Sequence, residues 1–152
     1  MRAIAGVVFW TAVMTGAAVA AGTGGVTYEN RVQGILADYC LSCHGSDAPT
    51  MEAFKKDQEG FKKAGKGPRM DTYSHLMVMV TGSDTGALMR RLDDGKAAQD
   101  GKPGNMYAYL GKTAGERSEN LRVIKEWVGG WTLKRKKDIS QEELKAIKAA
   151  ER

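Results

Sequence analysis

Apolar residues recur along this chain at the spacing of helices, and nowhere do they alternate convincingly with polar residues as they do in strands. The clearest case is the segment 28–39, whose apolar residues follow the i, i+4, i+7, i+8 and i+11 spacing of one helix face. These residues are Tyr28, Val32, Ile35, Leu36 and Tyr39. We therefore expect an all-α fold that begins with an amphipathic helix over this segment.

Three further helices are predicted from capping residues and apolar faces. The first begins near Asp71 or Thr72 and ends at Gly82, and the next covers 85–92, capped by Ser83 or Asp84. A longer helix opens at the capping box Thr113-Ala114-Gly115-Glu116 and stops at Gly129-Gly130. The expected apolar faces are Leu76, Met79 and Val80 in the first of these helices, and Leu121, Ile124 and Val128, flanked by Trp127, in the last.

Polar segments rich in glycine separate these helices. Residues 45–69 carry many lysines, and we expect a loop there with one short helix near 51–63. Residues 93–112 form a second glycine-rich loop. A last capping box, Ser140-Gln141-Glu142-Glu143, opens a helix anchored only by Leu144 and Ile147, and we expect this tail helix to lie on the surface.

The N-terminus has the pattern of an export signal. Arg2 precedes an apolar run over 3–14, and the small residues Ala18-Val19-Ala20 mark a cleavage site after Ala20 or Ala21. The alternative is an uncleaved membrane anchor, but a spanning helix needs about 20 apolar residues and the second half of this stretch is only weakly hydrophobic. The chain then divides into a signal peptide (1–21), a helical domain (22–131) and a basic tail (132–152).

The chain carries a modest excess of positive charge. Its formal net charge is +5, and removal of Arg2 with the signal lowers this to +4. The excess is concentrated at Lys134-Arg135-Lys136-Lys137. Such a balance suits docking to an acidic partner protein or to anionic lipid, and it is too small and too poor in interleaved aromatic residues for nucleic acid.

The two cysteines of the chain occur in one motif. Export to an oxidising compartment first suggests a disulfide, but Cys40-Leu41-Ser42-Cys43-His44 is C-x-x-C-H, the attachment signature of c-type haem. The spacing lets both sulfurs reach the two vinyl groups along one haem edge, and the adjacent imidazole then ligates the iron. We expect one covalent haem c at Cys40, Cys43 and His44, because no internal repeat supports a multihaem chain.

Other interpretations of this motif explain less. A structural zinc site needs four nitrogen or sulfur ligands, and only His75 remains outside the motif. A thioredoxin-type redox pair expects a βαβ setting that this sequence lacks. A plain disulfide leaves the neighbouring histidine unexplained.

With these elements in place, the layout resembles the class I c-type cytochromes, in their bacterial branch, over about 28–131. The segment Ile35–Gly45 is similar to the family's entry into the haem motif, 72–76 and 86–92 to its middle helices, and 124–128 to its last helix. The resemblance implies a small helical domain wrapped around one haem. It also implies that the terminal helices pack together, joining Ile35 and Leu36 to Ile124 and Trp127.

The family places its distal iron ligand, a methionine, in a G-x-M-P loop before the last helix. Gly104-Asn105-Met106 falls in that position, but Tyr107 replaces the proline that would restrict φ. Met77, Met79 and Met89 lie on apolar helix faces and are expected to fill the core. Met51 and Met70 come early for this fold, and Met1 and Met14 leave with the signal. Met106 is thus the expected distal ligand, with His75 or an open site as alternatives.

These features predict a periplasmic electron carrier between redox protein partners rather than an enzyme, since no acid–base pair or nucleophile is apparent. Lys55, Lys56, Lys62 and Lys63 are candidates to surround the haem edge and steer docking, although a solvated loop explains them as well. Two other functions stay open. One is a haem subunit dedicated to a periplasmic oxidoreductase, docked through Trp131 and the basic tail. The other is a membrane-anchored cytochrome.

Overall fold

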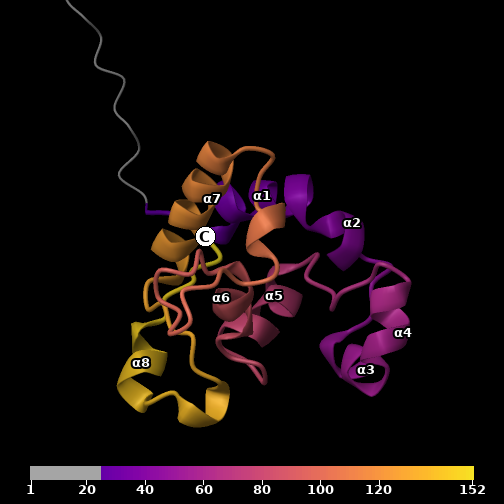
Figure 1. The fold of residues 1–152 in the computed structure, drawn as a ribbon. Coiled ribbons are helices and arrows are strands. Elements are labelled where there is room, and N and C mark those ends of the chain that lie inside the picture. The colour runs from indigo at the N-terminus through magenta and orange to yellow at the C-terminus, as the bar shows by residue number, and fades with distance from the viewer. Residues whose placement is uncertain (1–24) are drawn as a thin grey trace, which may run out of the picture.

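The computed structural model describes residues 25–152, and the predicted signal peptide over 1–21 lies outside them. The described part is helical, as predicted, and its only bridge between extended segments joins Gly129 to Ile147 (Figure 1). Its α-helices are α1 (Gln33–Tyr39), α2 (Leu41–His44), α3 (Met51–Lys56), α4 (Gln58–Lys63), α5 (Tyr73–Val80), α6 (Ala87–Leu92), α7 (Ala114–Val128) and α8 (Gln141–Ala146). A π-helical turn, η1 (Tyr28–Val32), precedes α1, and η2 (Tyr107–Tyr109) and η3 (Lys136–Asp138) are 3₁₀ turns.

The N-terminal helix forms as its apolar stripe predicts. The turn η1 runs directly into α1, and Thr27 begins it with a reciprocal cap, in which the Thr27 hydroxyl accepts from the Asn30 amide and the Asn30 side chain accepts from the Thr27 amide. Val32 and Leu36 are almost completely buried. This face delivers Cys40 at the end of α1.

Of the two middle helices, α5 begins as predicted and α6 does not. Thr72 caps α5 as expected, since its hydroxyl accepts from the His75 amide at 3.2 Å. Neither Ser83 nor Asp84 caps α6, which starts after Gly86 with a φ of 78°. The physical reason is that the Asp84 carboxylate already accepts hydrogen bonds from Lys55 and from the Ser83 hydroxyl, both at 2.7 Å.

The segment 51–63 contains two short helices where one was predicted. Asp57 separates α3 from α4, and its carboxylate accepts a hydrogen bond from the Gly60 amide at 2.9 Å. An aspartate that caps a new helix in this way ends the preceding one, because its own backbone leaves the helical conformation.

Both predicted ends of helix α7 are confirmed. The Thr113 hydroxyl accepts from the Glu116 amide and the Glu116 carboxylate accepts from the Thr113 amide, each at 3.1 Å. At the other end Gly129 has a φ of 72°, a left-handed value that favours glycine. Trp127, which was predicted to flank the apolar face, is only 1% exposed and belongs to the core.

The prediction of a surface-lying tail helix is wrong for its last residues. Helix α8 has no buried residue, but the helix ends at Ala146 and the non-helical segment that follows returns to the core. The Lys148 and Ala149 amides donate to the Val128 and Trp127 carbonyl oxygens, at 2.8 and 3.0 Å. The Ala150 carbonyl oxygen accepts from the Tyr28 amide at 2.9 Å. The tail therefore joins the first and last core helices, and Figure 1 places the C-terminus beside α7.

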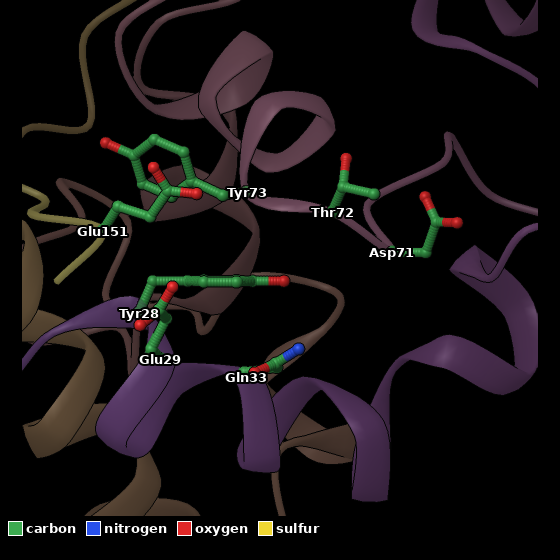
Figure 2. Close-up of a pocket in the computed structure, with 7 residues that line it drawn as sticks. All are labelled: Tyr28, Glu29, Gln33, Asp71, Thr72, Tyr73 and Glu151. Atoms are coloured by element: carbon green, nitrogen blue, oxygen red, sulfur yellow. The ribbon is translucent and has the colours of Figure 1, made fainter.

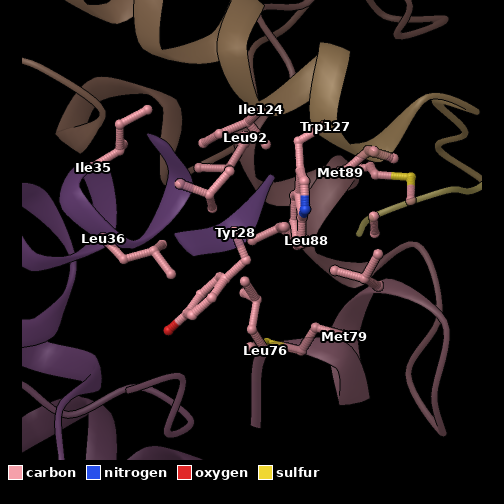
Figure 3. Close-up of a cluster of buried hydrophobic side chains, with 14 of the residues drawn as sticks. Tyr28, Ile35, Leu36, Leu76, Met79, Leu88, Met89, Leu92, Ile124 and Trp127 are labelled. Carbon is pink, nitrogen blue, oxygen red and sulfur yellow. The ribbon is translucent and has the colours of Figure 1, made fainter. Parts of the chain in front are cut away.

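The core lies where these helices meet. Side chains from η1, α1, α5, α6 and α7 converge in one buried cluster (Figure 3). Tyr28 is central to it, with ring centroids 5.5 Å from Tyr73 and 6.5 Å from Trp127. The predicted packing of the terminal helices thus occurs mainly through η1 and α7. Within residues 25–152, none of the helices has the length and apolar content needed to cross a membrane.

Candidate functional site

The C-x-x-C-H motif folds as one tight turn at the junction of α1 and α2. The Cys40 amide donates to the Leu36 carbonyl oxygen at 2.8 Å and closes α1. The Cys40 carbonyl oxygen then accepts from the amides of both Cys43 and His44, at 3.2 and 3.0 Å. This turn brings both sulfurs and the imidazole together over five residues.

The two thiols of this turn are free and differ in environment. Cys43 is exposed and Cys40 is partly buried against the core. Burial raises the pKa of the Cys40 thiol to about 11. The sulfurs are not joined to each other, so both are available for bonds to another group.

The His44 ring is held in one orientation by a distant loop. Its Nδ1 lies 2.6 Å from the Pro68 carbonyl oxygen. A carbonyl oxygen only accepts, so Nδ1 carries the proton and Nε2 keeps its lone pair. Burial lowers the pKa of His44 and so favours the neutral ring, and the Pro68 hydrogen bond has a smaller effect in the opposite direction. A histidine that ligates a metal has this arrangement, in which one ring N–H donates to a carbonyl oxygen and the other nitrogen is free to bind the metal.

The loop that holds His44 is itself hydrogen-bonded to the motif. The Gly67 amide donates to the Cys43 carbonyl oxygen and the Met70 amide to the His44 carbonyl oxygen, each at 2.9 Å. Gly67 packs so closely on the imidazole that a Cβ atom there would collide with the His44 ring. Sequence reasoning missed Gly67 and Pro68, because no local pattern links them to a histidine more than 20 residues earlier.

The free thiols and the oriented imidazole fit a covalent haem c. They would supply two thioether sulfurs and a nitrogen ligand, with the glycine at position 67 leaving room for the ring. The same residues do not fit a zinc site, since the described residues contain no group of three or more histidines, cysteines or carboxylates placed to hold an ion.

Met106 lies in the loop between α6 and α7. The loop is held to the end of α6, where the Met106 amide donates to the Arg91 carbonyl oxygen at 2.9 Å and the Gly104 amide to that of Asp93 at 2.8 Å. The Met106 side chain is partly buried against the core. Tyr107 stands where the family has proline, and its amide, which proline lacks, donates to the Gly104 carbonyl oxygen at 3.0 Å.

The remaining methionines divide by burial. Met70, Met79 and Met89 are buried in the core, and the Met89 sulfur accepts from the Thr132 amide at 3.3 Å. Met51 and Met77 are partly buried. The prediction that Met79 and Met89 fill the core is confirmed, whereas Met77 lies at the edge of the core.

His75, the alternative ligand, is engaged at the start of α5. Its Nδ1 lies 2.9 Å from the Asp71 carboxylate and 2.9 Å from the Thr72 hydroxyl. Arg69 donates two hydrogen bonds to the same carboxylate, at 2.8 and 2.9 Å. These local polar contacts account for the position of the ring.

The chain also has an open surface depression of about 420 Å³ between η1, the start of α5 and the C-terminal segment (Figure 2). It is lined by Tyr28, Glu29, Gln33, Asp71, Thr72, Tyr73 and Glu151. None of the predicted site residues belongs to this lining, so the depression is separate from the C-x-x-C-H turn.

Comparisons with known proteins agree with this geometry. The family model described as PccH cytochrome c matches residues 27–150. The solved structure of the monohaem cytochrome PccH from Geobacter sulfurreducens is 53% identical, with a TM-score of 0.78, and the match covers 84% of this chain and 99% of that one. No curated protein sequence matches. The chain therefore belongs to the PccH cytochrome c family, and it is a monohaem c-type cytochrome with one covalently bound haem c.

Proposed function

We propose that this chain is an exported, periplasmic carrier of single electrons, with Cys40 and Cys43 as the thioether residues, His44 as the proximal iron ligand and Met106 as the distal one. Residues 1–21 would be the signal peptide removed on export. The observation that carries the assignment is the His44 ring, whose Nδ1 is held by the Pro68 carbonyl oxygen while Nε2 stays free.

When bound, the haem supplies one-electron oxidation and reduction. The protein's part is to hold and orient. Covalent attachment at Cys40 and Cys43 prevents loss of the group outside the cytoplasm. Pro68 and Gly67 restrict the His44 ring, so that its orientation need not change between oxidation states. As the second iron ligand, the Met106 thioether would favour a higher reduction potential than a second histidine would.

The proposed partners are redox proteins with acidic docking surfaces, and the basic tail supports this choice. Lys55, Lys56 and Lys62 each form an ion pair with a nearby carboxylate, at 2.7, 2.8 and 2.8 Å, which neutralises much of that loop. In the tail, by contrast, Arg135 and Lys137 are exposed and form no ion pair with any residue from 25 to 152. Unpaired surface cations steer association with acidic proteins.

The alternative of a dedicated enzyme subunit relied on Trp131 as a docking residue. In the structure the Trp131 indole donates to the buried Asp93 carboxylate at 3.0 Å, and Lys125 lies over its ring at 5.1 Å. Trp131 thus has a role inside the fold, and we propose the freely diffusing carrier instead.

The ligand assignment is tested with protein exported together with its haem-attachment machinery. Oxidised wild-type protein should show the weak far-red absorption band of sulfur-to-iron ligation, and Met106→Ala should abolish it. His75→Ala is the matched control and should keep the band. A band that survives in Met106→Ala, or disappears in His75→Ala, would overturn the assignment of Met106.

Mass spectrometry of the mature protein tests the remaining parts. A mass equal to the chain from residue 21 or 22 onwards plus one haem would support both cleavage and attachment. A chain that keeps its first 21 residues would instead support the membrane-anchored alternative. In the Cys40→Ala variant the haem should remain bound through Cys43 alone and keep one unreacted vinyl group, which shifts the absorption of its reduced pyridine complex. A shift of zero relative to the wild type would contradict the role of Cys40.

A further inference from the structure

The loop that carries Met106 is attached to α6 mainly through one residue, Arg91. The Arg91 carbonyl oxygen, one of the last of the helix and therefore without an intrahelical partner, accepts from the Met106 amide at 2.9 Å. The guanidinium of the same residue donates from Nη1 to the Asn105 side-chain oxygen at 3.0 Å. Backbone and side chain of Arg91 thus hold two consecutive residues of the loop.

The close packing of Gly104 reinforces this attachment. A Cβ atom at position 104 would collide with the carbonyl oxygens of Arg90 and Arg91, so only glycine lets the loop lie this near the helix end. Helix α6 is a rigid support, because Leu88, Met89 and Leu92 are buried at 4, 0 and 5% exposure.

We propose that Arg91 is a positioning residue for Met106, which keeps the methionine in place through the Asn105 contact and the end of α6. The inference rests on the proposed ligation of iron by Met106. It also explains how the loop is ordered without the proline that Tyr107 replaces. The hydrogen bond that Arg91 donates to Asn105, the one that its carbonyl oxygen accepts from Met106, and the turn closed by the Tyr107 amide restrict the segment in place of a fixed φ.

The neighbouring Arg90 provides a matched control. It lies on the same helix and carries the same charge, but its guanidinium contacts the Lys134 and Thr85 carbonyl oxygens rather than the loop. Replacing either arginine with methionine removes one positive charge and keeps most of the aliphatic stem.

The test measures how readily imidazole displaces the distal ligand in the oxidised, haem-loaded protein. Apparent imidazole affinity rises as the methionine spends more time off the iron. For Arg91→Met and for Asn105→Ala we expect a rise of about three- to tenfold, the range that follows from loss of one modest hydrogen bond. In the double variant the imidazole affinity should rise no further than in either single variant, since both substitutions remove the same contact. Arg90→Met should bind imidazole as the wild type does.

Two outcomes would overturn the inference. Wild-type imidazole affinity in both Arg91→Met and Asn105→Ala would show that the contact does not position Met106, and an equal rise in Arg90→Met would attribute the effect to charge alone. Denaturant unfolding of each variant identifies any rise that comes from general loss of stability, which would count against the inference. If Met106→Ala keeps the far-red band, the proposed ligation fails instead, so the two failures are distinguishable.

Discussion

At the Cys43–His44 turn, the geometry of the proposed haem site depends on contacts of single atoms. One carbonyl oxygen, that of Pro68, decides which nitrogen of His44 carries a proton. One missing side chain, at Gly67, leaves room for the ring. Neither residue is chemically reactive, yet both restrict the orientation of the His44 ring.

Gly67→Ala should therefore destabilise the haem-loaded protein. The added methyl group collides with the imidazole, and either the ring or the loop must move. We expect a loss of about 1–3 kcal/mol in the free energy of unfolding, the usual cost of overpacking, and an altered visible spectrum. Gly34→Ala is the control, because nothing lies within 4 Å of a Cβ atom there. It should be neutral or stabilising by up to about 1 kcal/mol. Equal stabilities for the two variants would contradict the steric argument.

Asp71 should make the stability depend on pH in the acid range. The paired Arg69 guanidinium lowers the pKa of Asp71 to about 2, below the value of about 3.9 in an unfolded chain. Its contribution is therefore complete above about pH 4 and is lost as the pH falls towards 2. Asp71→Asn should cost up to about 1 kcal/mol at neutral pH, since Arg69 is partly exposed, and almost nothing at pH 2. Denaturant unfolding at pH 7, 4 and 2 measures this, and a difference that stays constant with pH would refute it.

At the scale of elements, the C-terminal segment holds the fold together. Residues 147–150 lie against η1 and α7 through backbone hydrogen bonds, and the Trp127 indole donates to the Ala150 carbonyl oxygen at 2.7 Å. The Tyr73 hydroxyl donates to the Ala149 carbonyl oxygen at 2.9 Å, which adds α5 to the same junction. Three elements that are far apart in sequence are thus joined by one short non-helical segment.

Deletion of residues 147–152 should cost about 3 kcal/mol or more of unfolding free energy, from the buried Ile147 side chain and the lost hydrogen bonds. Deletion of Arg152 alone is the control, because it removes only an exposed ion pair with Glu29 at 3.1 Å. That control should lose less than about 1 kcal/mol. Denaturant titration followed by helical circular dichroism gives both values, and similar losses for the two deletions would mean that the segment is not structural.

At the scale of the whole molecule, net charge affects how fast the protein associates with charged reactants. The positive excess calculated from the full sequence is concentrated in the exposed 134–137 segment, because several lysines elsewhere are paired with nearby carboxylates. A carrier of this kind should attract negatively charged reactants at long range and repel positively charged ones.

Electron transfer should accordingly depend on salt. Oxidation by ferricyanide, an anion, should slow as ionic strength rises from about 0.01 to 0.15 M, because the screening length shortens from about 30 to 8 Å. A cationic cobalt complex should show the opposite trend. Stopped-flow absorbance measures both rates, and a variant with Arg135→Gln and Lys137→Gln should show a weaker dependence on salt. The same trend for both oxidants would exclude electrostatic steering.

Local sequence patterns were sufficient for the parts of this protein that depend on neighbours a few residues apart. The helix over 28–39, the capping boxes at Thr113 and Ser140, and the C-x-x-C-H motif all depend on such short spacings, and so the all-α fold and the single haem c could be predicted. Hydrogen bonds within one turn and one helix face are specified by the residues that form them.

Tertiary structure decided what depends on residues far apart along the chain. The Pro68 partner of His44, the attachment of the Met106 loop to Arg91, and the return of the tail to Tyr28 and Tyr73 all join segments that no local pattern connects. The tail shows the reason most clearly. Its composition is that of a surface helix, but Ala149 becomes fully buried because η1, α5 and α7 leave unpaired donors and apolar surface there, and these exist only after the helices have packed.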